Sequence, residues 1–200
     1  MNLKSKNGFN TSLWLLIAAP ITIFFITVML GRSLLLDQSQ IFLVKVAVVF
    51  LVGGAIMVNR VNNVPMQLMG FTVIPVVFGG MLSVTLTNSD HILSAVFVVL
   101  ACVVVAIVIS CFHQDLLKGA EDKLNVVLLV LVFSSFCGHA LKIDSSIINY
   151  AFALVFVCSL QGCITTIREE LKTFSNYIRV ANNIFINIVG LFISVLCILS

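Results

Sequence analysis

Long apolar runs, separated by short polar stretches, dominate the pattern along this chain. Seven such runs occur, over residues 12–31, 41–58, 64–87, 92–112, 124–141, 147–167 and 182–199. A helix of about 20 residues crosses the ~30 Å hydrocarbon core of a membrane, whereas the strands of a barrel alternate polar and apolar residues over about ten positions. The pattern therefore predicts an all-α fold, a polytopic transmembrane bundle of about seven helices that forms a single domain over residues 1–200.

Composition supports a membrane protein and excludes a water-soluble one. Hydrophobic residues make up 60% of the 200 residues and charged residues only 10%, against roughly 45–50% and about 25% in soluble domains. The net charge of +3 is scattered, without a basic patch, so no nucleic-acid partner is expected. The lipid bilayer is the first predicted partner, and a multi-pass protein of the cell (inner or plasma) membrane is the predicted location.

The positions of lysine and arginine predict the orientation of the bundle. If the N-terminus is cytoplasmic, eight basic residues lie on the inner side and three on the outer side. The inner set is Lys4, Lys6, Arg60, Lys118, Lys123, Arg168, Lys172 and Arg179, and the outer set is Arg32, Lys45 and Lys142. Because cytoplasmic loops carry an excess of basic residues, the N-terminus is predicted to be cytoplasmic.

Residues 168–181 have the pattern of an amphipathic helix. Leu171, Phe174, Ile178 and Ala181 recur at helical spacing on one face, and charged or polar residues such as Arg168, Lys172 and Arg179 occupy the other. We expect a short helix on the cytoplasmic surface or a polar extension of the sixth span. A docking site for a soluble partner is the alternative.

Charges within the spans are the strongest clue to function, because a buried charge is costly unless it is used or paired. Every carboxylate falls in a predicted loop, and Lys45 is the one clear charge inside a span. Its ammonium can reach the outer headgroups or contact an anion or substrate, in which case Asp144 is its best candidate partner. The missing carboxylates argue against coupling through a buried acid, but not against a facilitator or channel.

Metal, cofactor and hydrolytic chemistry find no support in the motifs. The six cysteines form no Cys-x-x-Cys pair and the three histidines form no ligand pattern, so no metal and no cofactor are expected. Ser135 and His139 lie four residues apart on one helical face, which is the spacing a nucleophile and its base would need. No Gly-x-Ser-x-Gly or phosphate-binding loop accompanies them, so the chain is not predicted to be an enzyme.

Polar side chains within the runs are the remaining candidates. They either hydrogen-bond between helices or line a wet pathway. The candidate pathway or binding residues are Lys45, Ser135, His139, Asp144, Gln161 and Thr165. The glycine pairs 53–54 and 79–80 are expected to let neighbouring helices approach closely, and Pro20 and Pro75 to kink their helices.

Two functions fit these features. The first is a small-solute permease or channel-like transporter, favoured by the kinked helices, the glycine pairs and the polar side chains. Its 200 residues leave little room for a pathway within one subunit, so a homo-oligomer is expected with it. The alternative is a non-catalytic accessory, regulatory or immunity-type subunit that acts through a membrane-protein partner, favoured by the missing carboxylates and by segment 168–181.

Overall fold

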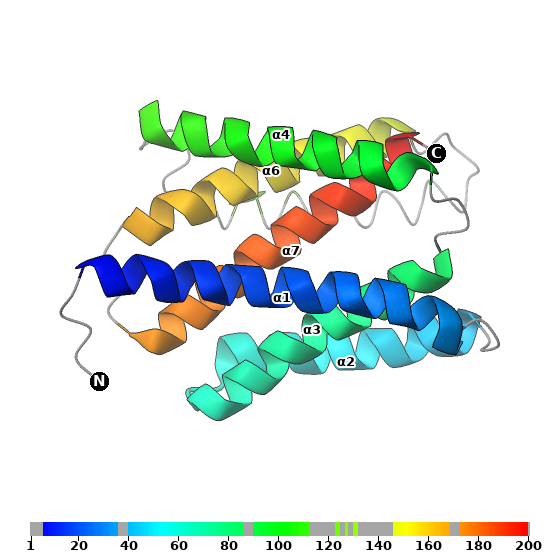
Figure 1. The fold of residues 1–200 in the computed structure, drawn as a ribbon, viewed down its shortest axis with the longest axis horizontal. Helices are drawn as coiled ribbons and strands as arrows, with labels where there is room; N and C mark the ends of the chain where they lie inside the picture. The colour runs from blue at the N-terminus through cyan, green and yellow to red at the C-terminus, as the bar shows by residue number, and fades with distance from the viewer. Residues whose placement is uncertain are drawn as a thin grey trace. The chain divides into compact units, whose positions relative to one another are not determined.

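The structure is a computed structural model that describes residues 6–35, 40–85, 90–112, 146–168 and 173–199, together with 123, 124, 127, 130 and 131. Within these residues the fold is all-helical (Figure 1). The helices are α1 (Lys6–Leu35), α2 (Gln40–Arg60), α3 (Val64–Thr85), α4 (Asp90–Phe112), α6 (Ser146–Arg168) and α7 (Phe174–Leu199). The prediction of an all-α fold is confirmed for this part of the chain.

Six of the seven predicted apolar runs coincide with these helices. The fifth run, 124–141, lies mostly outside the described residues. Three helical segments among the described residues are long and apolar enough to cross a membrane: Val64–Ser83, Ile147–Ile164 and Phe174–Leu199. The count of seven crossings and the cytoplasmic N-terminus stay predictions.

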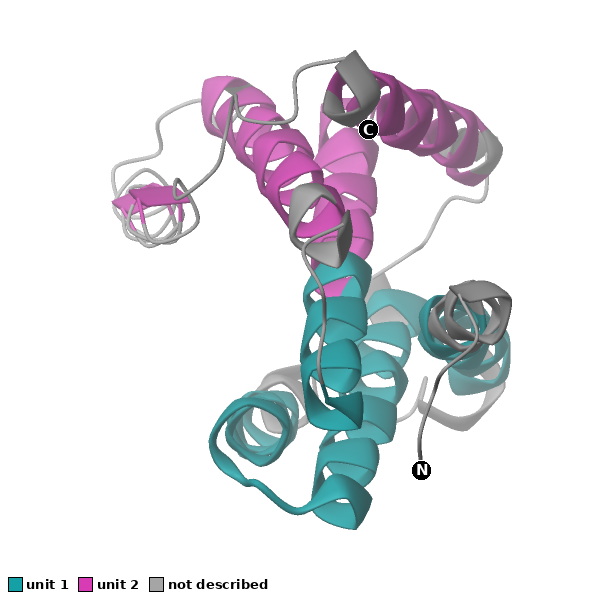
Figure 2. Cartoon of the chain, turned by 90° about the vertical axis from the view of Figure 1, so that its left-hand side faces the viewer, with its two compact units in different colours: residues 1–87, 171–185 teal, residues 88–170, 186–200 magenta. Residues whose placement is uncertain are grey.

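The chain divides into two compact units, which are coloured separately in Figure 2. Unit 1 contains Met1–Thr87 and Leu171–Phe185, and unit 2 contains Asn88–Glu170 and Ile186–Ser200. Helix α7 therefore contributes its first half to unit 1 and its second half to unit 2. In unit 1, α3 contacts α1 and α2, and in unit 2, α4 contacts α6.

In unit 1, α3 packs against both α1 and α2 through glycines. A Cβ atom at Gly79 would lie 2.7 Å from the backbone oxygen of Phe24 in α1, and one at Gly70 would lie 2.6 Å from the backbone oxygen of Gly54 in α2. The absence of side chains is what lets these backbones meet. The expected close approach is confirmed at Gly54 and Gly79, whereas Gly53 has nothing within 4 Å of such an atom.

The same contacts give the directions of the helices in unit 1. Gly79 lies against Phe24 and Thr27 while Ser83, further along α3, lies against Gly31, so α1 and α3 run the same way. Gly54 lies against Ile74 and Gly70 against Val58, so α2 runs the opposite way. Successive crossings of one membrane would produce this alternation.

The first half of α7 completes the core of unit 1. Ile178 and Phe185 are fully buried, and the Phe185 ring meets the Phe24 ring edge-on at 6.1 Å between centroids. In unit 2, α6 contacts α4, and α6 also packs against the second half of α7, where the Phe156 ring covers Gly190. Burial of these apolar side chains and close contact at glycine supply the packing in both units.

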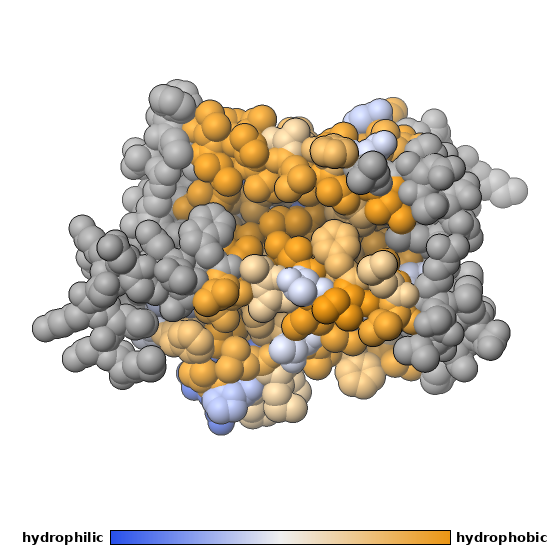
Figure 3. Space-filling view, in the orientation of Figure 1, coloured by the Kyte–Doolittle hydropathy of each residue, from blue (hydrophilic) through white to orange (hydrophobic). Residues whose placement is uncertain are grey.

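The surface of the described helices is apolar, as lipid contact requires. Large hydrophobic side chains project outward from several helices, among them Met29 at 80% exposure, Val49 at 70% and Ile147 at 78%. In Figure 3, hydrophobic residues cover most of the coloured part of the visible face. Since soluble monomers rarely expose large contiguous apolar patches, this surface supports a membrane-embedded protein.

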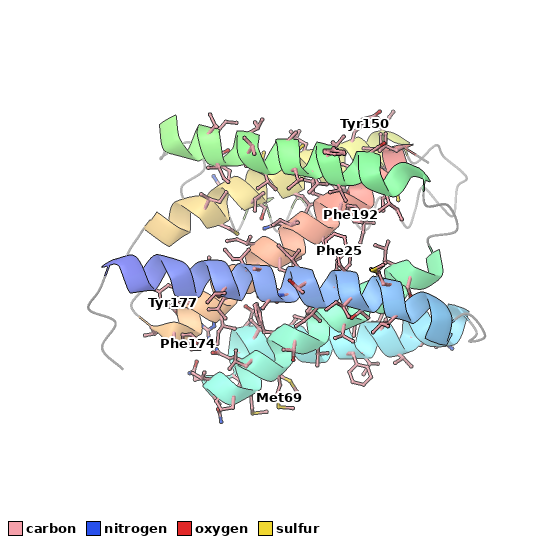
Figure 4. The ribbon with its side chains drawn as sticks, viewed as in Figure 1. Phe25, Met69, Tyr150, Phe174, Tyr177 and Phe192 are labelled. Atoms are coloured by element: carbon pink, nitrogen blue, oxygen red, sulfur yellow. The ribbon has the colours of Figure 1, made fainter. Side chains whose placement is uncertain are left out.

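Residues 174–181 differ from the expected arrangement. They are the first turns of α7, which continues without a break through the predicted seventh span. Phe174 is exposed and Tyr177 is buried at this end of the helix (Figure 4), and Ile178 and Ala181 are buried inside unit 1. On the apolar face of this stretch, Ile178 and Ala181 therefore pack on protein, whereas Phe174 stays exposed. Residues 169–172 lie outside the described part of the chain.

Substitution of Gly70 by alanine tests the glycine contacts. The added Cβ would meet the backbone oxygen of Gly54 and the Cβ of Met57, at 2.6 and 2.7 Å, and neither atom can move without its helix. We expect the free energy of unfolding, measured by SDS titration in mixed micelles, to fall by about 1–3 kcal/mol. Gly53→Ala is the matched control and should cause no loss, because its Cβ meets nothing and alanine favours helix by up to ~1 kcal/mol. Equal stability of the two variants would contradict the described packing.

Candidate functional site

Helix α7 is where burial and polarity coincide. Its candidate span is 56% buried, against 44% for Val64–Ser83 and 28% for Ile147–Ile164. Even so, it carries Ser175, Arg179 and Asn182 in its first half, at spacings of four and three residues. With 3.6 residues per turn, these three side chains lie on one face of the helix. We call them the polar stripe of α7.

Gln67 connects this stripe to the turn between α2 and α3. Its side chain is fully buried, and Nε2 donates to the backbone oxygens of Val58 at 3.2 Å and Val61 at 2.8 Å. The same nitrogen lies 2.7 Å from Oγ of Ser175. The last carbonyls of a helix have no partner within it, so Gln67 satisfies the end of α2 and joins it to α7.

Arg179 strengthens the same junction. Its Nε donates to the backbone oxygen of Val58 at 3.3 Å, and its Nη2 donates to Oδ1 of Asn62 at 3.2 Å. A positive charge at the C-terminal end of α2 also suits the helix dipole there. The side chains that the structure describes include no aspartate or glutamate, so within them the guanidinium is held by neutral oxygens alone.

Three buried amide atoms in unit 1 have no hydrogen-bond partner among the residues that the structure describes. They are Oε1 of Gln67 and both Oδ1 and Nδ2 of Asn182, and both residues are fully buried. For Asn182 the result does not depend on which way the amide is turned, because both of its polar atoms are involved. Leaving a buried polar group unpaired costs about 1–3 kcal/mol, and native proteins contain few such groups. Asn182 therefore stands out as a buried amide that the described packing leaves without a hydrogen-bond partner.

The polar residues of unit 2 are placed differently. Asn187 is buried and its Nδ2 lies 3.5 Å from Sγ of Cys163 in α6, while Oγ of Ser194 donates to the backbone oxygen of Gly190 at 2.9 Å. Gln161 is also buried, two residues before Cys163. These contacts are interhelical or local hydrogen bonds of the kind that polar side chains form in membrane bundles.

The six predicted site residues are only partly described. Lys45 is exposed and belongs to unit 1, and Gln161 is buried and belongs to unit 2. Thr165 lies in α6, but its side chain is outside the described set, as are Ser135, His139 and Asp144 entirely. The suggested pairing of Lys45 with Asp144 therefore stays a prediction. Among the described residues, no group of His, Cys, Asp and Glu side chains could hold a metal ion.

Sequence reasoning missed Gln67 and Asn182. Both stand within the first turns of a predicted span, a position that suggests an interfacial side chain. The signal that could have found Gln67 is its spacing of three and seven residues from Gly70 and Ile74, which places it on the packing face of α3. For Asn182 the signal was its alignment with Ser175 and Arg179.

Gln67→Leu removes the hydrogen bonds that hold the junction. Leucine keeps the volume of the side chain but cannot donate a hydrogen bond. The backbone oxygen of Val61 then loses its donor Gln67, and the backbone oxygen of Val58 keeps only Arg179 as a donor. We expect the free energy of unfolding to fall by about 1–3 kcal/mol, measured by SDS titration in mixed micelles. A variant as stable as the wild type would show that the junction does not hold the helices together.

Asn182→Leu should have the opposite effect. It replaces an unpaired buried amide by an apolar side chain of similar size. In the same SDS titration we expect the free energy of unfolding to rise by about 1–3 kcal/mol. Asn183→Leu is the control at the neighbouring, exposed position and should change stability much less. Destabilisation by Asn182→Leu would mean that the amide has a partner in the folded protein.

Comparison with known proteins adds no relative to this description. No protein-family model, no curated protein and no solved structure matches the chain. Its function is therefore inferred from the burial and the hydrogen bonds of its own side chains.

Proposed function

We propose that the chain is a small-solute permease or channel-like transporter, with the polar stripe of α7 as part of the route. The observation that carries this proposal is Asn182, a fully buried amide of which neither polar atom has a partner within the described part of the chain. A transported solute, or the water that accompanies it, would provide the missing hydrogen bonds. Transient pairing with a passing molecule explains why the protein keeps an amide there at a cost to stability.

The surroundings of Asn182 support this role. Lipid tails cannot hydrogen-bond, so polar side chains inside a bundle either bond across helices or face a wet space. Gln67 and Arg179 form hydrogen bonds across helices at the α2–α3 turn. Asn182 lies on the same face of α7, three residues beyond Arg179, and does not. The junction thus anchors the helix, and Asn182 is the residue of the polar stripe without a described partner.

The transport proposal includes the membrane topology. Seven crossings with a cytoplasmic N-terminus would make the α2–α3 turn and the start of α7 cytoplasmic, since each follows an even number of crossings. The alternating directions of α1, α2 and α3 support this arrangement. In it, Arg60 and Arg179 add to the positive charge of the cytoplasmic side.

Accessibility of a cysteine at position 182 tests the proposal. In a chain whose six native cysteines are replaced by serine or alanine, Asn182→Cys is labelled in membranes with a small water-soluble maleimide. Thiolates form in water and hardly at all in hydrocarbon, so modification reports wet surroundings. We expect the cysteine at position 182 to react. The cysteine at position 183 should react far more slowly, because this exposed neighbour on another face of α7 would face lipid in the proposed bundle.

A silent position 182 would contradict transport through this part of the bundle. If Asn182→Cys reacts only after denaturation, the interior of unit 1 is dry. The accessory or regulatory subunit would then be the better hypothesis, and the next step would be to find its membrane-protein partner.

A further inference from the structure

We propose that the transported molecule is a small, uncharged solute that both donates and accepts hydrogen bonds, of the class that includes urea and simple amides. This inference rests on the proposed transport function and adds the chemistry of the solute to it. It is drawn from the unpaired atoms of unit 1 and from the charges beside them.

The unpaired atoms set the hydrogen-bonding requirement. Nδ2 of Asn182 needs an acceptor, and Oδ1 of Asn182 and Oε1 of Gln67 each need a donor. Chloride can only accept hydrogen bonds and a metal cation offers only positive charge, so neither satisfies both kinds of atom at Asn182. A urea-like molecule has N–H groups for the two oxygens and a carbonyl for the amide nitrogen.

The side-chain amides of Gln67 and Asn182 lie at different levels along α7, so a solute could contact them in succession. Gln67 is bonded to Ser175, and Asn182 lies seven residues further along α7 on the same face. Two turns of helix correspond to about 10.5 Å. A small solute would therefore meet the amide of Asn182 and the oxygen of Gln67 one after the other, exchanging one set of hydrogen bonds for the next.

The charges of the stripe disfavour ions of either sign. Arg179 lies between Ser175 and Asn182, and no acidic side chain is among those described in either unit. A cation would be repelled by the guanidinium, whose described partners are the neutral oxygens of Val58 and Asn62. An anion would be attracted, but a guanidinium binds oxyanions in strong charge-assisted pairs, and beyond it the stripe offers no second cation to which the anion could pass.

Solute flux into vesicles tests this inference. The purified chain is reconstituted into liposomes, and stopped-flow light scattering follows swelling as urea, acetamide or glycerol enters. Potassium and chloride movement is followed in parallel with ion-sensitive dyes. We expect the wild type to admit urea and acetamide faster than protein-free vesicles do, and to leave the ion signals at the protein-free level.

The matched variants are Asn182→Leu and Asn183→Leu. Asn182→Leu should slow urea entry by about tenfold, the effect of losing a hydrogen bond to the solute, while its folded state in SDS titration stays at least as stable as the wild type. Asn183→Leu should transport like the wild type, because that side chain is exposed and outside the stripe.

The outcomes separate the two proposals. Ion flux without urea flux would overturn the neutral solute and leave transport standing. Urea entry unaffected by Asn182→Leu would remove Asn182 from the route. If no tested solute or ion crosses faster than in protein-free vesicles, the transport function itself is contradicted.

Discussion

A hydrocarbon solvent cannot hydrogen-bond to protein, and this constraint organises every described part of the chain. Backbone groups are satisfied within helices, and the hydroxyls of Thr22 and Thr27 donate to carbonyls four residues earlier in their own helix. Where α2 ends, water would normally satisfy the free carbonyls. Here Gln67 and Arg179 do so instead. The same requirement makes an unpaired amide conspicuous, because lipid offers Asn182 no substitute.

The hydrocarbon solvent also determines how the helices pack against one another. Because lipid tails are as apolar as leucine side chains, the helices gain little by hiding apolar surface from lipid, and close contact has to hold them together. Backbone approaches at Gly70 and Gly79 provide such contact in unit 1, and in unit 2 the side chain of Phe156 packs directly on Gly190. Large side chains such as Met29 and Val49 are thereby left on the outside.

The sequence was sufficient for the fold class and for the positions of most helices, since a long apolar run has few other solutions. It also predicted close approach at Gly54 and Gly79. It could not show which face of a helix meets another, and that is what distinguishes buried Asn182 from exposed Asn183. Nor could it show that the polar face of 174–181 binds the α2–α3 turn, because Val58 and Asn62 lie more than 100 residues away in the chain. The roles predicted for Lys45, Ser135, His139, Asp144, Gln161 and Thr165 stay predictions.

The junction at the α2–α3 turn also affects how the protein is made. Unit 1 combines the first 87 residues with a segment that begins at residue 171. The ribosome therefore releases α1, α2 and α3 well before the first half of α7 has been made. During that interval Gln67 lacks Ser175, and Phe24 lacks Phe185. Until α7 is made, α1, α2 and α3 would lie in the bilayer with an incomplete core, and such an intermediate is one that the insertion machinery would have to protect. Truncation within α7 would leave it in that state permanently and expose it to membrane quality control.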